Sequence, residues 1–208
     1  MSSALNVPSI DRLIHELSKL PGIGAKTAER LALSIVKKTK DDVTSFSEAL
    51  LDVKALIKEC PECYCYTENE GVCSFCENEE RKTSPYICVV KNPTDIAKIE
   101  SSGAFSGSYH VLHGCIAPLD GVGPEDVRIS ELLTRVRMRQ ESDVSVDEVI
   151  VALDADLEGD TTALYLKEIL QDYNVPVSRL AHGVPMGSYI DYVDQRTLGK
   201  ALENRIKL

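Results

Sequence analysis

The sequence predicts a chain of several modules, in which helices and a cysteine-rich segment precede a mostly parallel α/β domain. Three observations lead to this fold class. Apolar residues recur at helical spacing over residues 9–58, whereas residues 60–76 hold five cysteines and no apolar period. From residue 86 onward, short β-branched runs alternate with helical patterns, and this alternation favours βαβ units.

The bulk composition is that of an ordinary soluble protein, with 43% hydrophobic and 27% charged residues in a chain of 208. This length is enough for one large domain or several small ones. The apolar runs are too short to span a bilayer, and residues 1–11 show no secretory signal. We therefore expect a protein of the bacterial or archaeal cytosol, or of an equivalent reducing compartment, without a membrane partner.

The charge is unevenly distributed along the chain. The net charge of −10 argues against a generic nucleic-acid binder. Residues 1–40, however, hold seven Lys/Arg against three Asp/Glu, a net of +4 that leaves −14 on the remaining 168 residues. The positive charge is thus concentrated near the N-terminus, where it marks either an anion-binding segment or a solvated helix face.

Three helices are expected before the cysteines. The first is predicted to begin after Ser9, a candidate N-cap behind Pro8, and to end at Pro21. The second and third follow from the apolar spacing over residues 28–35 and 46–57.

The stretch "LPGIGAKTAERLA", residues 20–32, joins the first two predicted helices. It is not a Walker A loop, because the glycine positions that such a loop requires hold Leu20 and Ala25. It is not a dinucleotide fingerprint either, because Thr27 replaces the third glycine and a helix precedes it. The pattern that remains is helix, tight turn, helix.

This pattern predicts a phosphate-binding helix-hairpin-helix element. Gly22 and Gly24 would let the chain turn and expose backbone N–H groups, beside the positive end of the next helix. Lys26 and Arg30, one turn apart, would add salt-dependent phosphate contacts. With three Phe, eight Tyr and no Trp, base stacking is disfavoured, so duplex or junction backbone binding is expected. The alternative is a purely structural turn between helices.

The cysteines follow a metal-ligand spacing. Cys60-x₂-Cys63 and Cys73-x₂-Cys76 are separated by nine residues and supply the four thiolates of a closed structural zinc site. Rubredoxin-like iron accepts the same ligands and is the alternative. Cys65 is not expected to be a ligand.

The second half of the chain is expected to form a parallel sheet with intervening helices. The predicted strands span residues 86–90, 109–114, 148–154 and 177–182, and the predicted helices span 93–101, 129–139, 161–173 and 193–206. Cys88 is expected to be a small apolar residue of the first strand, and Cys115 a loop or core residue.

The order of these motifs, with "ICVVKNPTDIAKIE", "YHVLHGCIAPLDGVGPEDV", "EVIVALDADLEGDTTALYL" and "RLAHGVPMGSYIDYVDQRTL", resembles the RecR family of bacterial recombination mediators. The resemblance implies a helix-hairpin-helix module over 1–57, a Cys₄ zinc finger over 58–83, a Toprim domain over 84–182 and a C-terminal strand/helix segment over 183–208 that wraps a neighbouring subunit. It further implies a DNA clamp, a homodimer or homotetrameric ring in the nucleoid, that works with RecO and RecF to load RecA at single-stranded gaps.

Acidic residues of the Toprim-like part are the remaining candidates. Catalytic Toprim domains hold Mg²⁺ with a glutamate after the first strand and an Asp-x-Asp after a later one. This chain has Asp154 and Asp156, but Lys91 stands where RecR relatives show glutamate. For the aspartates, N-capping of a helix expected to start near 160 is the alternative. Asp95 and Glu158 match acidic positions that the family uses toward RecO.

These features favour a non-enzymatic, DNA-binding repair protein. A metal-dependent Toprim phosphotransferase or nuclease is the alternative, opposed by Lys91 and by the lack of a nucleophile constellation. A zinc-stabilised interaction module without a DNA role is a third hypothesis, opposed by the positive N-terminal segment. The stretch "SYIDYVD", residues 188–194, resembles a Walker B motif in relatives, and without a Walker A loop it is interpreted as structural.

Overall fold

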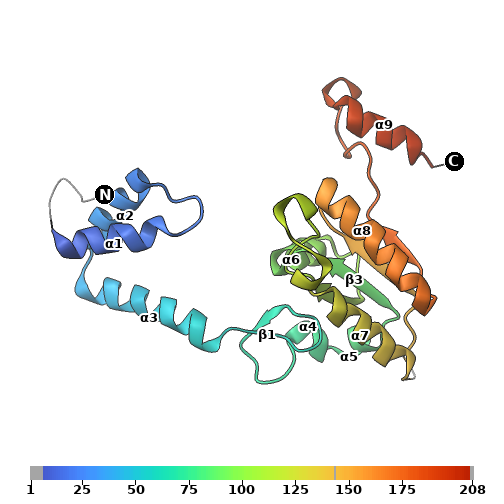
Figure 1. The fold of residues 1–208 in the computed structure, drawn as a ribbon, viewed down its shortest axis with the longest axis horizontal. Helices are drawn as coiled ribbons and strands as arrows, with labels where there is room; N and C mark the ends of the chain where they lie inside the picture. The colour runs from blue at the N-terminus through green and yellow to red at the C-terminus, as the bar shows by residue number, and fades with distance from the viewer. Residues whose placement is uncertain (1–6, 143, 207–208) are drawn as a thin grey trace. The chain divides into compact units, whose positions relative to one another are not determined.

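The computed structural model describes residues 7–142 and 144–206. The chain divides into two compact units, Met1–Ile57 and Lys58–Leu208. The first unit consists of the helices α1 (Pro8–Ser18), α2 (Ala25–Val36) and α3 (Lys40–Leu56) (Figure 1). Ala28 and Ala32 of α2 are fully buried. Their small side chains allow α1 and α2 to pack closely.

The start of α1 differs from the sequence prediction. The N-cap is Val7 and not Ser9, because Pro8 takes the first helical position. Proline is favoured there, since its missing N–H is one that a helix leaves unpaired and its fixed φ suits the helix. The helix ends at Ser18, so Pro21 lies within the following turn.

A tight turn joins α1 to α2. The N–H of Ile23 donates to the carbonyl of Leu20 at 3.1 Å, and Gly22 has a φ of 78°. Proline followed by a left-handed glycine is the signature of a type II turn. Gly24 has an ordinary φ of −78° and is the N-cap of α2. Only Gly22, therefore, uses the conformational freedom that the sequence suggested for both glycines.

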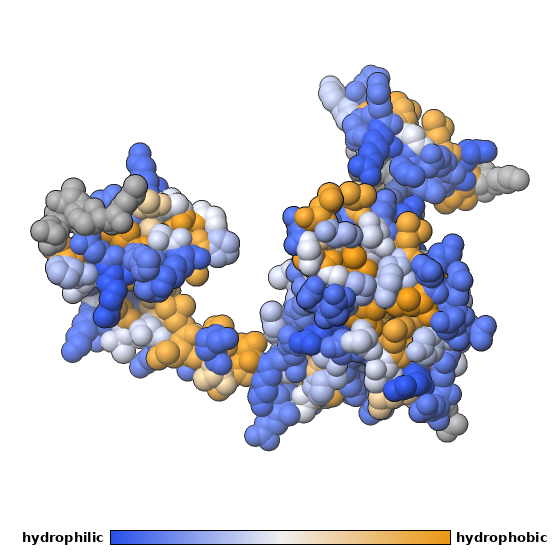
Figure 2. All heavy atoms as spheres, viewed as in Figure 1, coloured by the Kyte–Doolittle hydropathy of each residue, from blue (hydrophilic) through white to orange (hydrophobic). Residues whose placement is uncertain are grey.

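The third helix presents its apolar side chains to solvent. It begins with a capping box, in which Thr39 accepts from the N–H of Asp42 at 3.1 Å. All of its residues are exposed in the isolated chain, and Figure 2 shows apolar residues gathered along it. The large apolar side chains that are 37–66% exposed are Val43, Phe46, Leu50, Leu51, Val53 and Leu56.

A four-stranded parallel sheet forms the centre of the second unit. Its strands are β3 (Tyr86–Val90), β4 (Ser108–Val111), β5 (Glu148–Ala152) and β6 (Val177–Arg179), in the order β4-β3-β5-β6. The predicted parallel α/β architecture is confirmed, although β4, β5 and β6 end earlier than their sequence patterns suggest. For β4 the reason is visible, because the backbone turns away at His113, which has a φ of 58°.

Successive residues of the strands point to opposite faces of the sheet, and each face packs against a different set of elements. Ile87 and Val89 of β3 pack with α7 (Ile129–Gln140) and α8 (Leu157–Leu170). Cys88 and Val90 point to the other face, where α6 (Pro93–Ser102) and the cysteine-rich segment cover the sheet. The sheet is thus buried on both sides, as continuous apolar strands require.

Short elements complete this unit. The cysteine-rich segment contains an antiparallel ribbon of β1 (Lys58–Glu59) with β2 (Tyr66–Thr67), followed by α4 (Ser74–Glu77) and α5 (Glu79–Thr83), none of which the apolar pattern indicated. Four 3₁₀ turns span Pro118–Asp120, Pro124–Asp126, Gln171–Tyr173 and Ile190–Tyr192. The last turn lies in the "SYIDYVD" stretch, and α9 (Gln195–Glu203) follows it. Within 7–142 and 144–206, no helix combines the length and apolar character of a membrane span.

Candidate functional site

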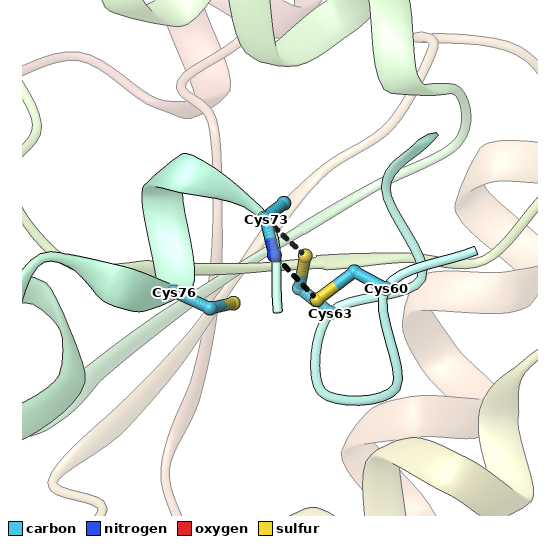
Figure 3. A group of neighbouring side chains, drawn as sticks. All are labelled: Cys60, Cys63, Cys73 and Cys76. Atoms are coloured by element: carbon cyan, nitrogen blue, oxygen red, sulfur yellow. Dashed lines mark hydrogen bonds between the residues drawn. The ribbon is translucent and has the colours of Figure 1, made fainter. Parts of the chain in front are cut away.

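Four cysteine thiols converge in the knuckle, the segment of residues 58–77. Cys60 and Cys63 lie in the loop between β1 and β2, whereas Cys73 and Cys76 lie at the N-cap and in the first turn of α4 (Figure 3). Their sulfur atoms are all within 4.8 Å of one another, and the four residues are at most 6% exposed. Four buried thiols in this arrangement form a closed site that fits a tetrahedral metal ion.

Backbone hydrogen bonds hold the ligand loop. The N–H of Tyr64 donates to the carbonyl of Cys60 at 2.9 Å, and the N–H of Cys60 donates to the carbonyl of Cys65 at 2.7 Å. The N–H of Cys73 points at the Cys60 sulfur, 3.3 Å away. Hydrogen bonds from the thiols of Cys63, Cys73 and Cys76 lower the pKa of Cys60. The same shared hydrogen bonds raise the pKa values of Cys63 and Cys76, so binding of a metal ion by all four sulfur atoms would release the protons that those thiols keep.

The other cysteines lie outside this group. Burial raises the pKa of Cys65 to about 11 and that of Cys88 to about 12, so both remain neutral thiols near neutral pH. Cys115 is also buried, and burial raises its pKa. These residues behave as small apolar side chains.

The knuckle is part of the core of the second unit. The N–H of Val111, at the end of edge strand β4, donates to the carbonyl of Cys63 at 2.8 Å. The ring of Phe75 meets that of Tyr109 edge-on, with 5.8 Å between the centroids. The metal-site cysteines share one apolar cluster with β3, β4 and α6. The knuckle and this face of the sheet therefore pack as one core.

A second candidate site lies at the carboxyl edge of the sheet. The chain crosses from β3 to β4 in one direction and from β5 to β6 in the other, so the connections diverge between β3 and β5. Ligands of open α/β folds bind at this switch point. Here Lys91 follows β3 and Asp154 follows β5, and their Nζ and Oδ2 atoms form an ion pair at 3.2 Å. The bond to Asp154 raises the pKa of Lys91, which stays protonated at neutral pH.

The second aspartate is engaged in helix capping. Asp156 is the N-cap of α8 and accepts from the N–H of Gly159 at 2.8 Å, so the helix begins at Leu157, earlier than its sequence pattern indicated. Gly159 is needed at this contact, because a Cβ there would lie 2.1 Å from the carbonyl oxygen of Asp154. Each aspartate therefore has a partner within the chain.

The two acidic residues proposed from the resemblance lie at the same edge of the sheet. Asp95 closes the capping box of α6, where its carboxylate accepts from the N–H of Asn92 at 2.9 Å. Glu158 lies in the first turn of α8 and is partly exposed. Both carboxylates are near positive helix ends, which favour negative charge.

The first unit carries the candidate anion site. In the described residues, no side chain caps the N-terminus of α2, so its first N–H groups are open beside the exposed Lys26. Lys26 and Arg30 line one groove on this helix together with Lys37. Our sequence reasoning missed Lys37, although its spacing of eleven residues from Lys26 returns to the same helix face.

Fold and site together define a Toprim-fold protein that carries a helix-hairpin-helix module and a four-cysteine knuckle that could hold a metal ion. Residues 86–181 match the Toprim domain family, 10–54 the RecR helix-hairpin-helix family and 183–206 the RecR C-terminal family. Recombination protein RecR of Bdellovibrio bacteriovorus is 52% identical over 205 residues, covering 98% of this chain and all of that protein. Its counterpart in Syntrophotalea carbinolica is 44% identical over 201 residues, covering 97% and 98%. The chain belongs to the RecR family of recombination proteins.

Proposed function

We propose that this chain is a non-enzymatic DNA-binding protein of recombinational repair in the bacterial cytoplasm. It acts as an oligomeric clamp that, with RecO and RecF, helps load RecA at single-stranded gaps. Family membership supports the repair role, and the uncapped start of α2 beside Lys26 and Arg30 supports DNA binding. We assign DNA contact to residues 1–57, the zinc finger to 58–83, the Toprim domain to 84–182 and subunit contact to 183–208.

The metal of the knuckle is proposed to be Zn²⁺. Cys60, Cys63, Cys73 and Cys76 would hold it, since zinc prefers four thiolates in closed structural sites. Its role would be to organise a segment whose own apolar content is small. It would take no part in chemistry, because all four positions are filled by protein.

DNA would be bound through its backbone, in duplex or junction form. The N–H groups after Gly24 and the turn at Gly22 would receive one phosphate, as helix N-termini do. Lys26 and Arg30 would contact neighbouring phosphates. Such contacts position the protein without reading sequence.

Clamp formation is supported by two helices with apolar faces in solvent. The exposed apolar residues of α3 and those of α9, such as Leu202 at 61% exposure, are typical of surfaces that a partner subunit covers. We expect light scattering to show a dimer or tetramer in the absence of DNA. With added duplex DNA, the mass should rise by one DNA per oligomer at low salt and fall back at high salt. A monomer at all protein concentrations, or DNA binding insensitive to salt, would contradict the clamp.

The Toprim domain is proposed to perform no phosphoryl transfer. Metal-dependent transfer requires carboxylates that fix Mg²⁺ against the phosphate. Here the ammonium group of Lys91 forms an ion pair with the carboxylate of Asp154, and the carboxylate of Asp156 caps the N-terminus of α8. An internal ammonium thus stands where a catalytic site would hold a cation.

We expect the purified protein with Mg²⁺ or Mn²⁺ neither to nick, relax nor prime DNA. Lys91→Glu, which introduces the family's glutamate, should increase Mn²⁺ affinity at least about tenfold in calorimetric titration, because it adds a ligand and removes the competing cation. Lys98→Glu, a charge reversal on exposed α6, is the control and should not change it. A DNA-cleaving activity that Asp154→Asn abolishes would establish the enzymatic alternative.

The acidic carboxyl edge is proposed to dock the basic surface of RecO. Glu158→Lys should weaken RecO binding about tenfold, a loss of ~1.4 kcal/mol, because it replaces attraction by repulsion at the contact. Asp95→Asn should also weaken it, while its amide oxygen still accepts from Asn92. Glu168→Lys, an exposed position at the other end of α8, is the matched control. Surface plasmon resonance measures all three. Loss of DNA binding in Glu158→Lys would mean that this edge contacts DNA.

A further inference from the structure

A groove that the proposed function does not use lies between the knuckle and α7. It encloses about 450 Å³. Pro61 and Tyr64 line it from the knuckle, Lys82 from α5, and Met138 from α7. Apolar surface therefore predominates in the lining, beside charged side chains of both signs, which include Glu62 and Glu131.

Two arginines of α7, one turn apart, also line the groove. Arg135 donates to the carbonyl of Tyr109, and Arg139 donates to the carbonyls of Ser84 at 2.9 Å and Lys82 at 3.1 Å. These bonds fix both guanidinium groups at the wall of the groove. A guanidinium has five N–H donors, so each retains donors beyond those bonds.

Neither guanidinium is neutralised within 7–142 and 144–206, where no carboxylate oxygen comes within 4.0 Å of Arg135 or Arg139. This contrasts with Arg128, the N-cap of α7, which pairs with Glu59 and Glu131, each at 2.9 Å. Burial, with the nearby cation of Arg135, lowers the pKa of Arg139 to about 10 against the opposing effect of the Glu62 carboxylate, so Arg139 remains charged at neutral pH. A partly buried cation without an ion-pair partner is unfavourable, and an incoming carboxylate would relieve this.

The apolar part of the groove offers a contact for an apolar side chain of a ligand. Met138 is 63% exposed at its edge, although it follows the buried Val136 by only two residues. Methionine adapts to differently shaped apolar partners, and methionine, tyrosine and arginine are enriched where proteins bind proteins. The combination of fixed guanidinium groups and an adaptable apolar wall suits a ligand with both a carboxylate and an apolar side chain.

We propose that this groove is the docking site for a short acidic segment of a partner protein, with carboxylates interleaved by apolar residues. A nucleic-acid strand fits less well, because it carries a phosphate at every nucleotide and would leave the apolar wall unused, whereas a peptide can space its carboxylates away from Glu62 and Glu131, which also line the groove. A peptide can place one carboxylate between the two arginines and its apolar neighbours against Met138.

The test uses the full-length, metal-loaded protein and a fluorescein-labelled hexapeptide, Asp-Leu-Asp-Phe-Asp-Leu, in fluorescence anisotropy. The neutral peptide Asn-Leu-Asn-Phe-Asn-Leu is the charge control. We expect the acidic peptide to bind at least tenfold more tightly than the neutral one. Met138→Glu should weaken acidic-peptide binding at least tenfold, because it places a carboxylate at the groove. Leu164→Glu, the same type of change at an exposed site of α8 outside the groove, should leave binding within twofold.

Metal content and melting temperature of both variants identify any general loss of folding. Lys82→Glu, a change at an exposed lysine of the groove, provides an independent second variant and should also weaken the acidic peptide. Equal affinity for acidic and neutral peptides, or equal effects of Met138→Glu and Leu164→Glu, would overturn the proposal. It would be overturned equally if Met138→Glu and Lys82→Glu impaired duplex DNA binding and left peptide binding intact.

Discussion

The Cys63→Ser variant is expected to lose its metal and to unfold about 6–12 °C below the parent chain. Cys63 contributes one thiol to the cluster, and its carbonyl accepts from Val111 at the end of β4. Apparent binding energies of structural zinc reach ~10–16 kcal/mol in small peptides. If only roughly 3 kcal/mol of this is lost from the second unit, a shift of ~2–4 °C per kcal/mol gives the expected change.

The matched control is Cys65→Ser. Cys65 is buried in the same segment but lies outside the thiol cluster, so this variant should retain a full equivalent of metal. Elemental analysis and thermal unfolding followed by circular dichroism measure the two effects. Full metal content in Cys63→Ser would show that Cys63 is not a metal ligand. Iron in the parent chain would favour the rubredoxin-like alternative. An unchanged melting temperature would show that the knuckle and the sheet are not coupled.

The Lys26→Ala/Arg30→Ala variant is expected to bind duplex DNA on the order of 10- to 100-fold more weakly at about 0.1 M salt. Each lost phosphate contact should reduce the slope of log K against log salt by roughly 0.9, so the two together by about 1.8. The loss should be equal for unrelated DNA sequences, because the contacts are to the backbone. A further change at Lys37 should reduce the slope again, since it lines the same groove.

Lys38→Ala is the control for this experiment. It removes one positive charge from an exposed residue next to Lys37, outside the groove. Fluorescence anisotropy at four salt concentrations gives the slope for each variant. Should Lys38→Ala reduce the slope by as much per removed charge as the double variant does, the effect would be one of net charge, and the hairpin would be structural only.

The switch point shows how a Toprim fold can exist without a complete acidic site. A lysine that follows β3 forms an ion pair with Asp154, while α8 engages Asp156 through Gly159. The charge of the aspartates is thus balanced by groups that belong to the chain. This arrangement leaves the outer carboxylates, such as Glu158, as the acidic surface presented to other molecules.

The sequence alone determined those features whose residue pattern lies within one short segment of the chain. Apolar periods indicated the three N-terminal helices and the alternating strands and helices, because the side chains that form each core face recur within a single element. The paired cysteine spacing indicated one cluster, since four thiols so close in sequence have few other arrangements. The turn at Gly22 was predictable in the same way, because proline followed by glycine favours the backbone angles of a type II turn.

Other features required the tertiary structure, because they depend on residues that are far apart in the sequence. Lys91 and Asp154 are 63 residues apart along the chain, and they come into contact only because β3 and β5 pair in parallel. The capping role of Asp156 depends on where α8 begins, and proline at the first position of α1 displaced the N-cap from Ser9. The contact of the knuckle with β4, and the lack of ion-pair partners for Arg135 and Arg139 among the described residues, follow from packing between elements, whose geometry no local pattern encodes.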